Sequence, residues 1–309
     1  MTNVLYPLRR VLFFAAVAGC IAAVTVAAFA AQSIRHGGLR EPLAALGGAG
    51  QREASFTIAP GERLSAVWQN LEAEGLASPA ALARIGAIAS FPQYRFVPPP
   101  STNPSRFEGL FVPGSYRIGL RAASSLPQEE RMYRDDLQIV NALLAQSAAR
   151  LGRFAGASGP PTYDDMILAS IVQKEDVPGT GYDLVASVFL NRLNAGMHLG
   201  SCPTLEYALG YHRPFLLDRD LAVKSPYNTY LNPGLPPTPI CAFTDRALAA
   251  VMRPVSSPYF FFVLDWVKNR IYFAKTYSEQ LRNADIARAD YVRAYGAAGL
   301  HKKEDGVFY

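Results

Sequence analysis

The sequence predicts an α+β protein in which amphipathic helices outnumber a few short strands, behind one segment that enters a membrane. Residues 162–176 and 182–195 carry apolar side chains at helical spacing, which predicts two helices that pack on a common core. Residues 259–264 and 270–275 are rich in aromatic and β-branched side chains, and this composition predicts a hairpin of two strands. Residues 11–31 contain no charged side chain, which is typical of a membrane-spanning helix.

Length and composition limit the possible functions. The length of 309 residues suggests about two domains and an additional segment. Half of the residues are hydrophobic, which is enough for a sizeable core. The net charge of +5 is mild, and the lysines and arginines are scattered along the chain instead of clustered. We therefore expect no nucleic-acid partner, while a modest positive charge suits anionic surfaces such as phospholipid or a cell-wall polymer.

The charge-free segment at residues 11–31 is long enough to cross a bilayer, since at ~1.5 Å per residue it matches a hydrocarbon core of ~30 Å. Two alternatives are a cleaved signal peptide, with a small-residue site at Ala28–Ala30, and a lipid-attachment site at Cys20. The apolar run is long for a signal peptide and continues past Cys20, so an uncleaved signal anchor is favoured. Residues 1–10 would then form a cytoplasmic tail, and residues 32–54, rich in Gly, Ala and Arg, would form a linker.

A small module is predicted at residues 55–100. Phe56–Ile58 alternates like a short strand, and a Pro-Gly turn follows it. Apolar side chains at helical spacing over residues 64–71 predict a helix, and residues 78–89 form a second helical run. The pattern therefore predicts a strand–helix–helix unit, which the prolines at 98–100 separate from the rest of the chain.

The remaining residues, 101–309, are predicted to form a second and larger domain. Residues 107–118 look like two short strands that are interrupted at Pro113-Gly114. The prolines within residues 197–243 oppose regular strands but fix backbone angles, so stiff loops are expected there. Capping residues predict further helices at three places: from Ser125 to about Leu151, from Thr244 to about Met252, and from Thr276 to about Tyr295.

Glu175 is the candidate catalytic residue. Thr162 and Asp165 form a capping-box pattern that marks the start of its helix. Helical spacing places Glu175 on the same face as three apolar side chains, those of Leu168, Ile171 and Val172. Partial desolvation would raise the pKa of this carboxyl, and a carboxylic acid that stays protonated near neutral pH can act as a general acid in glycosidic-bond cleavage. The alternative is that the apolar face ends before Glu175, which would leave it a solvated residue at the helix end.

The candidate substrate-binding residues lie within the proline-rich loops. Tyr227, Asn228, Thr229 and Tyr230 place amide and hydroxyl groups beside aromatic faces, a combination that commonly holds sugars. The alternative is that these residues only form well-packed turns. The other acidic residues provide no second carboxylate at an obvious partner position; among them are Asp176, Asp183, Glu206, Asp218 and Asp220.

The cysteines allow two interpretations. Cys20 lies in the membrane segment, whereas Cys202 and Cys241 both lie in the exported part, where a pair usually forms a disulfide. Closing a loop of about 40 residues would contribute roughly 4 kcal/mol on the chain-entropy model. The competing hypothesis is a thiol nucleophile at Cys202 with His198 or His212 as its base. It is less favoured because a second exported cysteine is available and because nothing around Cys202 indicates a helix N-terminus.

The histidines indicate no metal centre. The four of them occur in no HxxxH or HxxE pattern, which a zinc site on a helix would need. We therefore expect neither a metal nor another cofactor.

Taken together, these segments resemble the MltG (YceG-like) family of endolytic murein transglycosylases, and the likeness covers most of the chain beyond the anchor. The segments similar to its catalytic half are ASIVQKE at 169–175, LVASVFLNRLNAGMHL at 184–199, PTLEYALG at 203–210, SPYNTYLNPGLPPTPI at 225–240 and PYFFFVLD at 258–265. FEGLFVPGSYR at 107–117 resembles the strand segment before that half, and residues 56–77 resemble the LysM-like module of the family.

The resemblance implies specific roles for single residues. The family helix that corresponds to residues 169–175 often carries two glutamates, of which one is the catalytic acid; here the first position is Gln173, so Glu175 is implied as the essential one. The family often has Asp immediately before the Pro-Thr pair, where this chain has Cys202, and the presence of Cys241 as well strengthens the disulfide hypothesis. The implied fold is a small LysM-like module followed by a larger, mainly helical, lysozyme-like catalytic domain with short strands.

The activity implied by the resemblance is internal cleavage of nascent peptidoglycan strands between MurNAc and GlcNAc, leaving a 1,6-anhydroMurNAc end. The enzyme would be anchored in the inner membrane by one helix, with its catalytic domain on the periplasmic side. Its partners would be glycan strands, membrane lipid around the anchor, and peptidoglycan synthases. Two alternatives stay open: a muramidase that uses water in place of the C6 hydroxyl, and a non-catalytic wall-binding scaffold.

Overall fold

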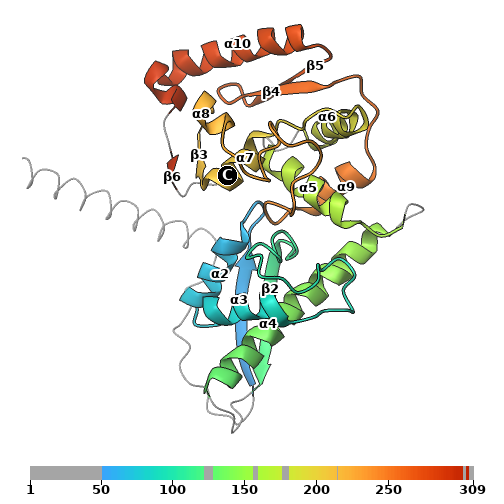
Figure 1. The fold of residues 1–309 in the computed structure, drawn as a ribbon, viewed down its shortest axis with the longest axis vertical. Coiled ribbons are helices and arrows are strands. Elements are labelled where there is room, and N and C mark those ends of the chain that lie inside the picture. Colours follow the sequence, from blue (N-terminus) through green and yellow to red (C-terminus); the bar gives the residue numbers. More distant parts are fainter. Residues whose placement is uncertain are drawn as a thin grey trace, which may run out of the picture. The chain divides into compact units, whose positions relative to one another are not determined.

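The computed structural model describes residues 51–121, 128–155, 159–175, 181–213, 215–301 and 304–305 (Figure 1). All of them belong to one compact unit, Gly50–Tyr309. The expected tail at 1–10, the anchor at 11–31 and most of the linker at 32–54 lie outside the described residues, so they stay predictions. Within the described part, every helix is too short or too polar to cross a bilayer.

The N-terminal part of the described chain is a β-α-α-β unit. Strand β1 (Gln51–Ile58) pairs antiparallel with β2 (Gly114–Arg121) along its whole length, so that Ile58 lies opposite Gly114. Helices α2 (Leu64–Ala73) and α3 (Pro79–Ile88) lie between the two strands in sequence and confirm the predicted strand–helix–helix order. Because β2 falls beyond residue 100, the sheet joins the predicted module to the segment that was placed in the second domain.

The prediction of two strands within residues 107–118 is wrong, because only β2 forms there. The preceding residues fold into turns that bury Phe107, Leu110 and Phe111 in the core instead of alternating across a sheet. Gly109 allows this path: its φ is +67°, and a Cβ atom there would lie 2.4 Å from the Cβ of Pro239. The aromatic run that resembles a strand is therefore a buried turn.

Helix α4 (Gln128–Leu151) packs against α3 and β2 and leads into a short 3-10 turn, η1 (Gly152–Phe154). The following helical layer contains α5 (Tyr163–Glu175), which packs on α6 (Tyr182–Asn194) and α9 (Asp245–Met252). These helices match the predicted ones closely, and Thr244 caps α9 as expected.

The predicted hairpin is also confirmed. Strand β4 (Phe261–Asp265) pairs antiparallel with β5 (Arg270–Ala274), and α10 (Tyr277–Tyr295) lies across both strands (Figure 1). The start of α10 has the predicted capping box, formed by Thr276 and Glu279. The 3-10 turn η2 (Ala297–His301) follows.

Short regular elements appear where only loops were predicted. Helix α7 (Cys202–Leu209) and helix α8 (Asp218–Leu221) both lie within residues 197–243, and β3 (Tyr211–His212) pairs with β6 (Glu304–Asp305). Helix α7 begins with a Cys-Pro pair, and proline is well suited to the first turn of a helix. The prolines of this region predicted stiff loops, so α7 was not expected there.

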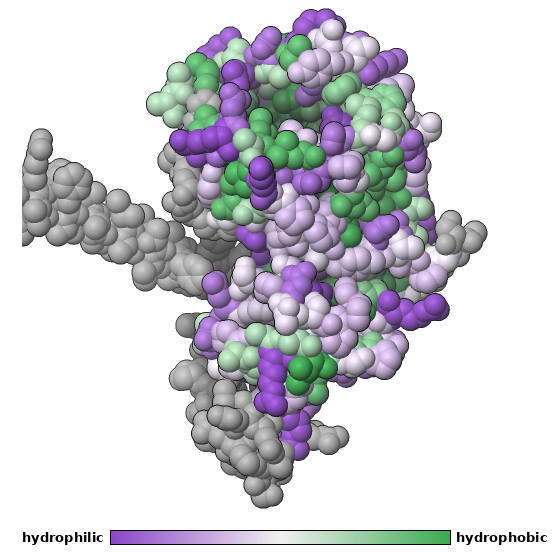
Figure 2. All heavy atoms as spheres, viewed as in Figure 1, coloured by the Kyte–Doolittle hydropathy of each residue, from purple (hydrophilic) through white to green (hydrophobic). Residues whose placement is uncertain are grey.

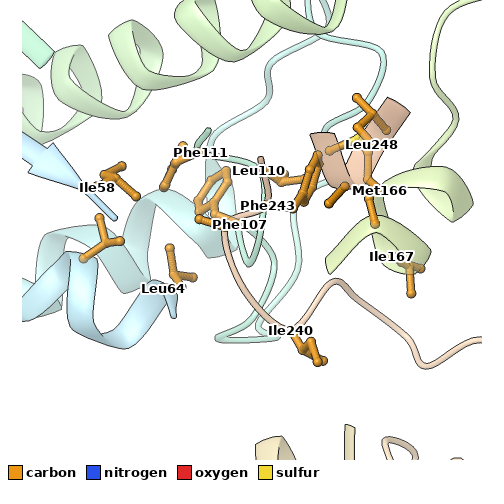
Figure 3. Packing of buried hydrophobic residues seen from close by; sticks show 14 of the residues in the cluster. Ile58, Leu64, Phe107, Leu110, Phe111, Met166, Ile167, Ile240, Phe243 and Leu248 are labelled. Carbon is orange, nitrogen blue, oxygen red and sulfur yellow. The ribbon is translucent and has the colours of Figure 1, made fainter. Parts of the chain in front are cut away.

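One hydrophobic cluster joins the β-α-α-β unit to the helical layer (Figure 3). The cluster includes side chains from β1, α2, the turns before β2, α5, α9 and the loop before α9. Figure 3 labels ten of them: Ile58, Leu64, Phe107, Leu110, Phe111, Met166, Ile167, Ile240, Phe243 and Leu248. On the face seen in Figure 2, hydrophilic and hydrophobic residues are interspersed. The described residues from 51 onward therefore share a core, although the sequence suggested two separate domains.

Candidate active site

Helix α5 carries the candidate acid at its C-terminal end. The predicted capping box is present: the Asp165 amide donates to Thr162 Oγ1 at 3.2 Å, and the Thr162 amide donates to Asp165 Oδ2 at 2.8 Å. Every residue from Met166 to Val172 is buried, so α5 is a central helix and its surroundings hold it on all sides. A rigid helix of this kind fixes the position of Glu175, its last residue.

Glu175 lies in the environment that the sequence predicted for it. Its side chain is half-buried, and Ser201 Oγ donates a hydrogen bond of 2.7 Å to Glu175 Oε1. Burial raises the pKa of Glu175 to about 7, and the negative charge of Glu206 acts in the same direction. The Ser201 hydrogen bond and the positive charge of Arg192 oppose this rise. The carboxyl is therefore substantially protonated at neutral pH, as a general acid must be.

Ser201 is positioned by the loop that follows α8 and by the first turn of α7. Its amide donates to Thr229 Oγ1 at 3.0 Å, and Thr229 Oγ1 lies 2.8 Å from Thr204 Oγ1. The preceding residue, Gly200, has φ +55°, and a Cβ atom there would come within 3.3 Å of the Arg192 guanidinium. Sequence reasoning missed Ser201, Thr204 and Arg192; a Ser placed two residues before a Pro is an N-cap signal that could have found Ser201.

Arg192 supplies a fixed positive charge beside the site. Its Nε atom donates to the Phe260 carbonyl at 2.6 Å, and another guanidinium N–H donates to the Leu199 carbonyl. Burial lowers the pKa of Arg192, but the electrostatic contribution of Glu175 raises it. These backbone contacts hold the guanidinium in place on α6, where it favours the ionised form of Glu175.

Tyr230 and Asn228 differ in their accessibility. The Tyr230 side chain is partly exposed, and its hydroxyl lies 3.0 Å from Cys202 Sγ, close enough to Glu175 for the two groups to interact electrostatically. Asn228 is fully buried: its amide donates to the carbonyls of Leu221 at 2.9 Å and Val223 at 2.8 Å, and Asn228 Oδ1 accepts from the Tyr230 amide. In this structure Asn228 shapes the loop, while Tyr230 faces the acid.

The two other predicted sugar contacts have internal partners. Thr229 is 1% exposed and holds Ser201, as described above. The Tyr227 hydroxyl lies 2.8 Å from Thr238 Oγ1, and the centre of its ring is 4.6 Å from that of Tyr207. The structure thus places Tyr230 against Cys202, within electrostatic range of Glu175, while Asn228 and Thr229 hold the backbone amides of Tyr230 and Ser201.

The described residues contain no group of three His, Cys, Asp or Glu side chains that could hold a metal ion. Among the polar groups that act on the Glu175 carboxyl are Ser201 and Arg192.

The YceG-like family matches residues 35–286, which make up most of the chain. The chain belongs to the YceG-like family. A crystal structure of a yceG-like protein from Listeria monocytogenes is similar with a TM-score of 0.53 and 27% identity, over 74% of this chain and 75% of that one.

Relatives from Bacillus and Streptococcus carry the name endolytic murein transglycosylase. That of Bacillus subtilis (strain 168) is 36% identical over 114 residues, which cover 37% of this chain and 31% of the relative. That of Streptococcus pneumoniae serotype 2 is 33% identical over 123 residues, which cover 38% of this chain and 22% of the relative. The matched part thus spans about a third or less of either transglycosylase.

The predicted Cys202–Cys241 disulfide is wrong for this YceG-like structure, in which both cysteines are free. Cys241 is buried against α5, where its thiol donates to the Ser170 carbonyl at 3.3 Å, whereas Cys202 opens α7 and contacts Tyr230. Two exported cysteines suggest a disulfide by their compartment, but a disulfide needs adjacent Cβ atoms, and sequence spacing does not supply that information.

The thiol-nucleophile alternative is not supported either. Cys202 does begin a helix, contrary to the sequence expectation, and a helix N-terminus would favour a thiolate. Desolvation and the negative charge of Glu175 nevertheless raise the pKa of Cys202. Because the Cys202 side chain is exposed, the charge of Glu175 is the cause that counts against a thiolate. His212, one of the two candidate bases, places Nδ1 2.8 Å from Glu206 Oε1.

Gln173 stands where the family often has a second glutamate, and it has a structural role here. Gln173 Nε2 donates to the Tyr182 hydroxyl at 2.9 Å, and Gln173 Oε1 accepts from the amide and the hydroxyl of Thr244 at 2.9 and 2.8 Å. This amide therefore links α5 to the starts of α6 and α9. Its contacts leave Glu175 as the carboxyl at the end of α5 that faces Ser201.

Gln173→Ala should destabilise the fold without changing the protonation of Glu175. The amide and hydroxyl of Thr244 would lose their acceptor, and we expect the free energy of unfolding to fall by about 1–3 kcal/mol. Gln173→Glu is the matched control, because a carboxylate still accepts from Thr244 and from the Tyr182 hydroxyl. Urea unfolding of the three proteins measures the effect. A pH–activity profile that moves in Gln173→Ala would contradict the purely structural role.

Proposed function

We propose that this chain is a lytic transglycosylase that cleaves peptidoglycan glycan strands internally, with Glu175 as its catalytic acid and base. The observation that carries the proposal is the half-buried Glu175 carboxyl, whose pKa burial raises to about 7 and which accepts a hydrogen bond from Ser201, in a member of the YceG-like family. The names of the Bacillus and Streptococcus relatives support murein as the substrate.

The geometry supports a two-step mechanism with one carboxyl. Protonated Glu175 donates its proton to the glycosidic oxygen as the bond from MurNAc C1 to that oxygen breaks, and the GlcNAc hydroxyl leaves. Glu175 is then ionised, and the charge of Arg192 favours this form. It takes the proton of the MurNAc C6 hydroxyl while that oxygen bonds to C1, which closes the anhydro ring and restores the acid. No second carboxylate is needed, because the nucleophile belongs to the substrate.

The order β1-α2-α3-β2 supports the further proposal that residues 51–121 form a LysM-like module that precedes a lysozyme-like catalytic domain. We propose as well that residues 11–31 anchor the enzyme in the inner membrane and leave the described part on the periplasmic side, near peptidoglycan synthases. The uncharged length of this segment supports the anchor.

The test of the function is mass analysis of the fragments that the purified chain releases from peptidoglycan. We expect anhydroMurNAc ends, which are lighter by one water than the ends that hydrolysis leaves. Hydrated ends would replace the transglycosylase by a muramidase and keep Glu175 as its acid. Binding to peptidoglycan with no released fragment would favour the non-catalytic scaffold instead.

A further inference from the structure

A second buried carboxyl, that of Glu108, lies outside the site described above. Glu108 is 3% exposed and belongs to the buried turns before β2. Glu108 Oε1 accepts from the amide of Leu64, the first residue of α2, at 2.8 Å. Glu108 Oε2 accepts from the hydroxyl of Tyr207, on α7, at 3.1 Å. One side chain therefore contacts both the β-α-α-β unit and the helix that begins beside Glu175.

The turn between β1 and α2 also contacts the loop before α9, at Ala242, and helix α7, at Tyr207. The Gly61 amide donates to the Ala242 carbonyl at 2.7 Å, and the Ala242 amide donates to the Glu62 carbonyl at 2.8 Å. The Arg63 guanidinium lies 4.1 Å from the centre of the Tyr207 ring, and its Nη2 donates to the Tyr207 carbonyl at 3.2 Å. Tyr207 is thus held at its ring, its carbonyl and its hydroxyl.

Helix α7 depends on such contacts because it is short. With eight residues it is far below the length at which a helix is stable alone. Its N-cap is Ser201, the residue whose hydroxyl donates to Glu175. A change in the position of Tyr207 would therefore be transmitted along less than two helical turns to the hydrogen bond on the catalytic carboxyl.

We propose that Glu108 is a positioning residue for the reaction: through Tyr207 it holds α7, and with α7 the Ser201 hydroxyl, against Glu175. This inference rests on the proposed function for its link to catalysis, but the positioning itself is a property of the fold. Glu108 acts through Tyr207 and Ser201 and does not touch the reacting atoms.

The polar groups around Glu108 accommodate both of its protonation states. Tyr207 Oη also lies 2.9 Å from Ser105 Oγ. With Glu108 ionised, Ser105 donates to Tyr207 and Tyr207 donates to Glu108; with Glu108 protonated, both directions can reverse. Burial raises the pKa of Glu108 to about 7, and the Leu64 amide and the charge of Arg63 oppose the rise. A glutamine would reproduce the protonated state, since it accepts from Leu64 and donates to Tyr207.

Lys174, on α5, interacts electrostatically with Glu108. It directly precedes Glu175, and its Nζ atom is buried without a hydrogen-bond partner among the described residues. Burial lowers the pKa of Lys174, while the charges of Glu206 and Glu108 raise it. The ionisable groups that interact with Glu108 are thus Arg63, Tyr163, Lys174, Tyr207 and Cys241. Those that interact with Glu175 are Arg192, Cys202, Glu206 and Tyr230.

The test compares Glu108→Ala, Glu108→Gln, Ser201→Ala and the double variant Glu108→Ala/Ser201→Ala in the full chain. The Ser201 hydrogen bond lowers the pKa of Glu175, so its loss in Ser201→Ala should move the high-pH limb of the activity profile to higher pH. We expect Glu108→Ala to move this limb in the same direction and to lower kcat/KM roughly 10- to 100-fold. Glu108→Gln should keep the high-pH limb and the kcat/KM of the parent. The double variant should move the high-pH limb no further than Ser201→Ala alone does.

Leu82→Ala is the control for lost stability, because it removes a buried side chain of α3, which packs on α2 and α4. It should lower the free energy of unfolding and leave the pH limb in place. A Glu108→Ala protein that is destabilised but keeps the pH limb of the parent would overturn the proposal, and so would an additive shift in the double variant.

An NMR titration of the side-chain carboxyl carbons measures the pKa of Glu175 directly, without any assay of activity. The Glu175 signal is the one that disappears in Glu175→Gln, and its pKa should rise in Glu108→Ala as in Ser201→Ala. If the parent cleaves no glycan but this rise is observed, the proposed function fails and the positioning by Glu108 stands. If the parent is active and the pKa of Glu175 is unchanged in Glu108→Ala, the positioning fails and the function stands.

Discussion

Glu175→Gln should abolish release of fragments from peptidoglycan while the protein remains folded. Glutamine has nearly the same volume, and its Oε1 can still accept the hydrogen bond from Ser201. It cannot donate a proton to the leaving oxygen, and it cannot later accept one from the C6 hydroxyl. Because both steps fail together, the loss should exceed the ~10²–10⁴-fold that one general acid–base contribution supplies.

The matched control is Glu72→Gln, the same substitution on the exposed face of α2. It should leave activity and the unfolding midpoint unchanged. The parent should also lose activity as the pH rises through about 7, because the group that starts the reaction is the protonated form of Glu175. Fragment release that persists in Glu175→Gln would sink the mechanism, whatever the products of the parent are.

The helices and the buried setting of Glu175 were the predictable part of this molecule. Apolar periodicity and two capping boxes placed α5 and α10 correctly, because both signals are local. Glu175 followed from the spacing of its helix, and its raised pKa has the predicted cause, burial. Local patterns of this kind involve residues within a few helical turns of each other, so they can be recognised before the tertiary fold is known.

The supporting groups were not predictable, because they meet across long sequence separations. Ser201 contacts Glu175 from the N-terminus of the short helix α7, 26 positions further along the chain, and Tyr207 of α7 contacts Glu108 from 99 positions away. Glu108 looked like a residue in a strand, although it belongs to a buried turn. Asn228 looked like a sugar ligand because its residue type fits, but burial decides that its amide serves the loop. Residue type suggests a chemistry, whereas burial and partners decide its use.

The residues that the structure describes should unfold together in one cooperative transition, and Phe111→Ala tests this. Phe111 is 2% exposed, and its ring packs near that of Trp68 of α2. It also lies beside Phe107 (Figure 3). Removing it should lower the free energy of unfolding by about 3–5 kcal/mol, the usual range for a buried Phe→Ala change. Ile88→Ala, at a side chain that is 56% exposed, is the control and should stay within about 0.5 kcal/mol.

The position of the two tryptophans makes this test decisive. Trp68 lies in the β-α-α-β unit, and Trp266 lies in the turn between β4 and β5, so a Trp68→Phe background leaves Trp266 as a probe of the other end of the described chain. Because one hydrophobic cluster spans both parts, Phe111→Ala should shift the urea midpoint reported by Trp266 as much as the midpoint of far-UV circular dichroism. Two separate transitions, with only the first displaced, would instead restore the two independent domains that the sequence suggested.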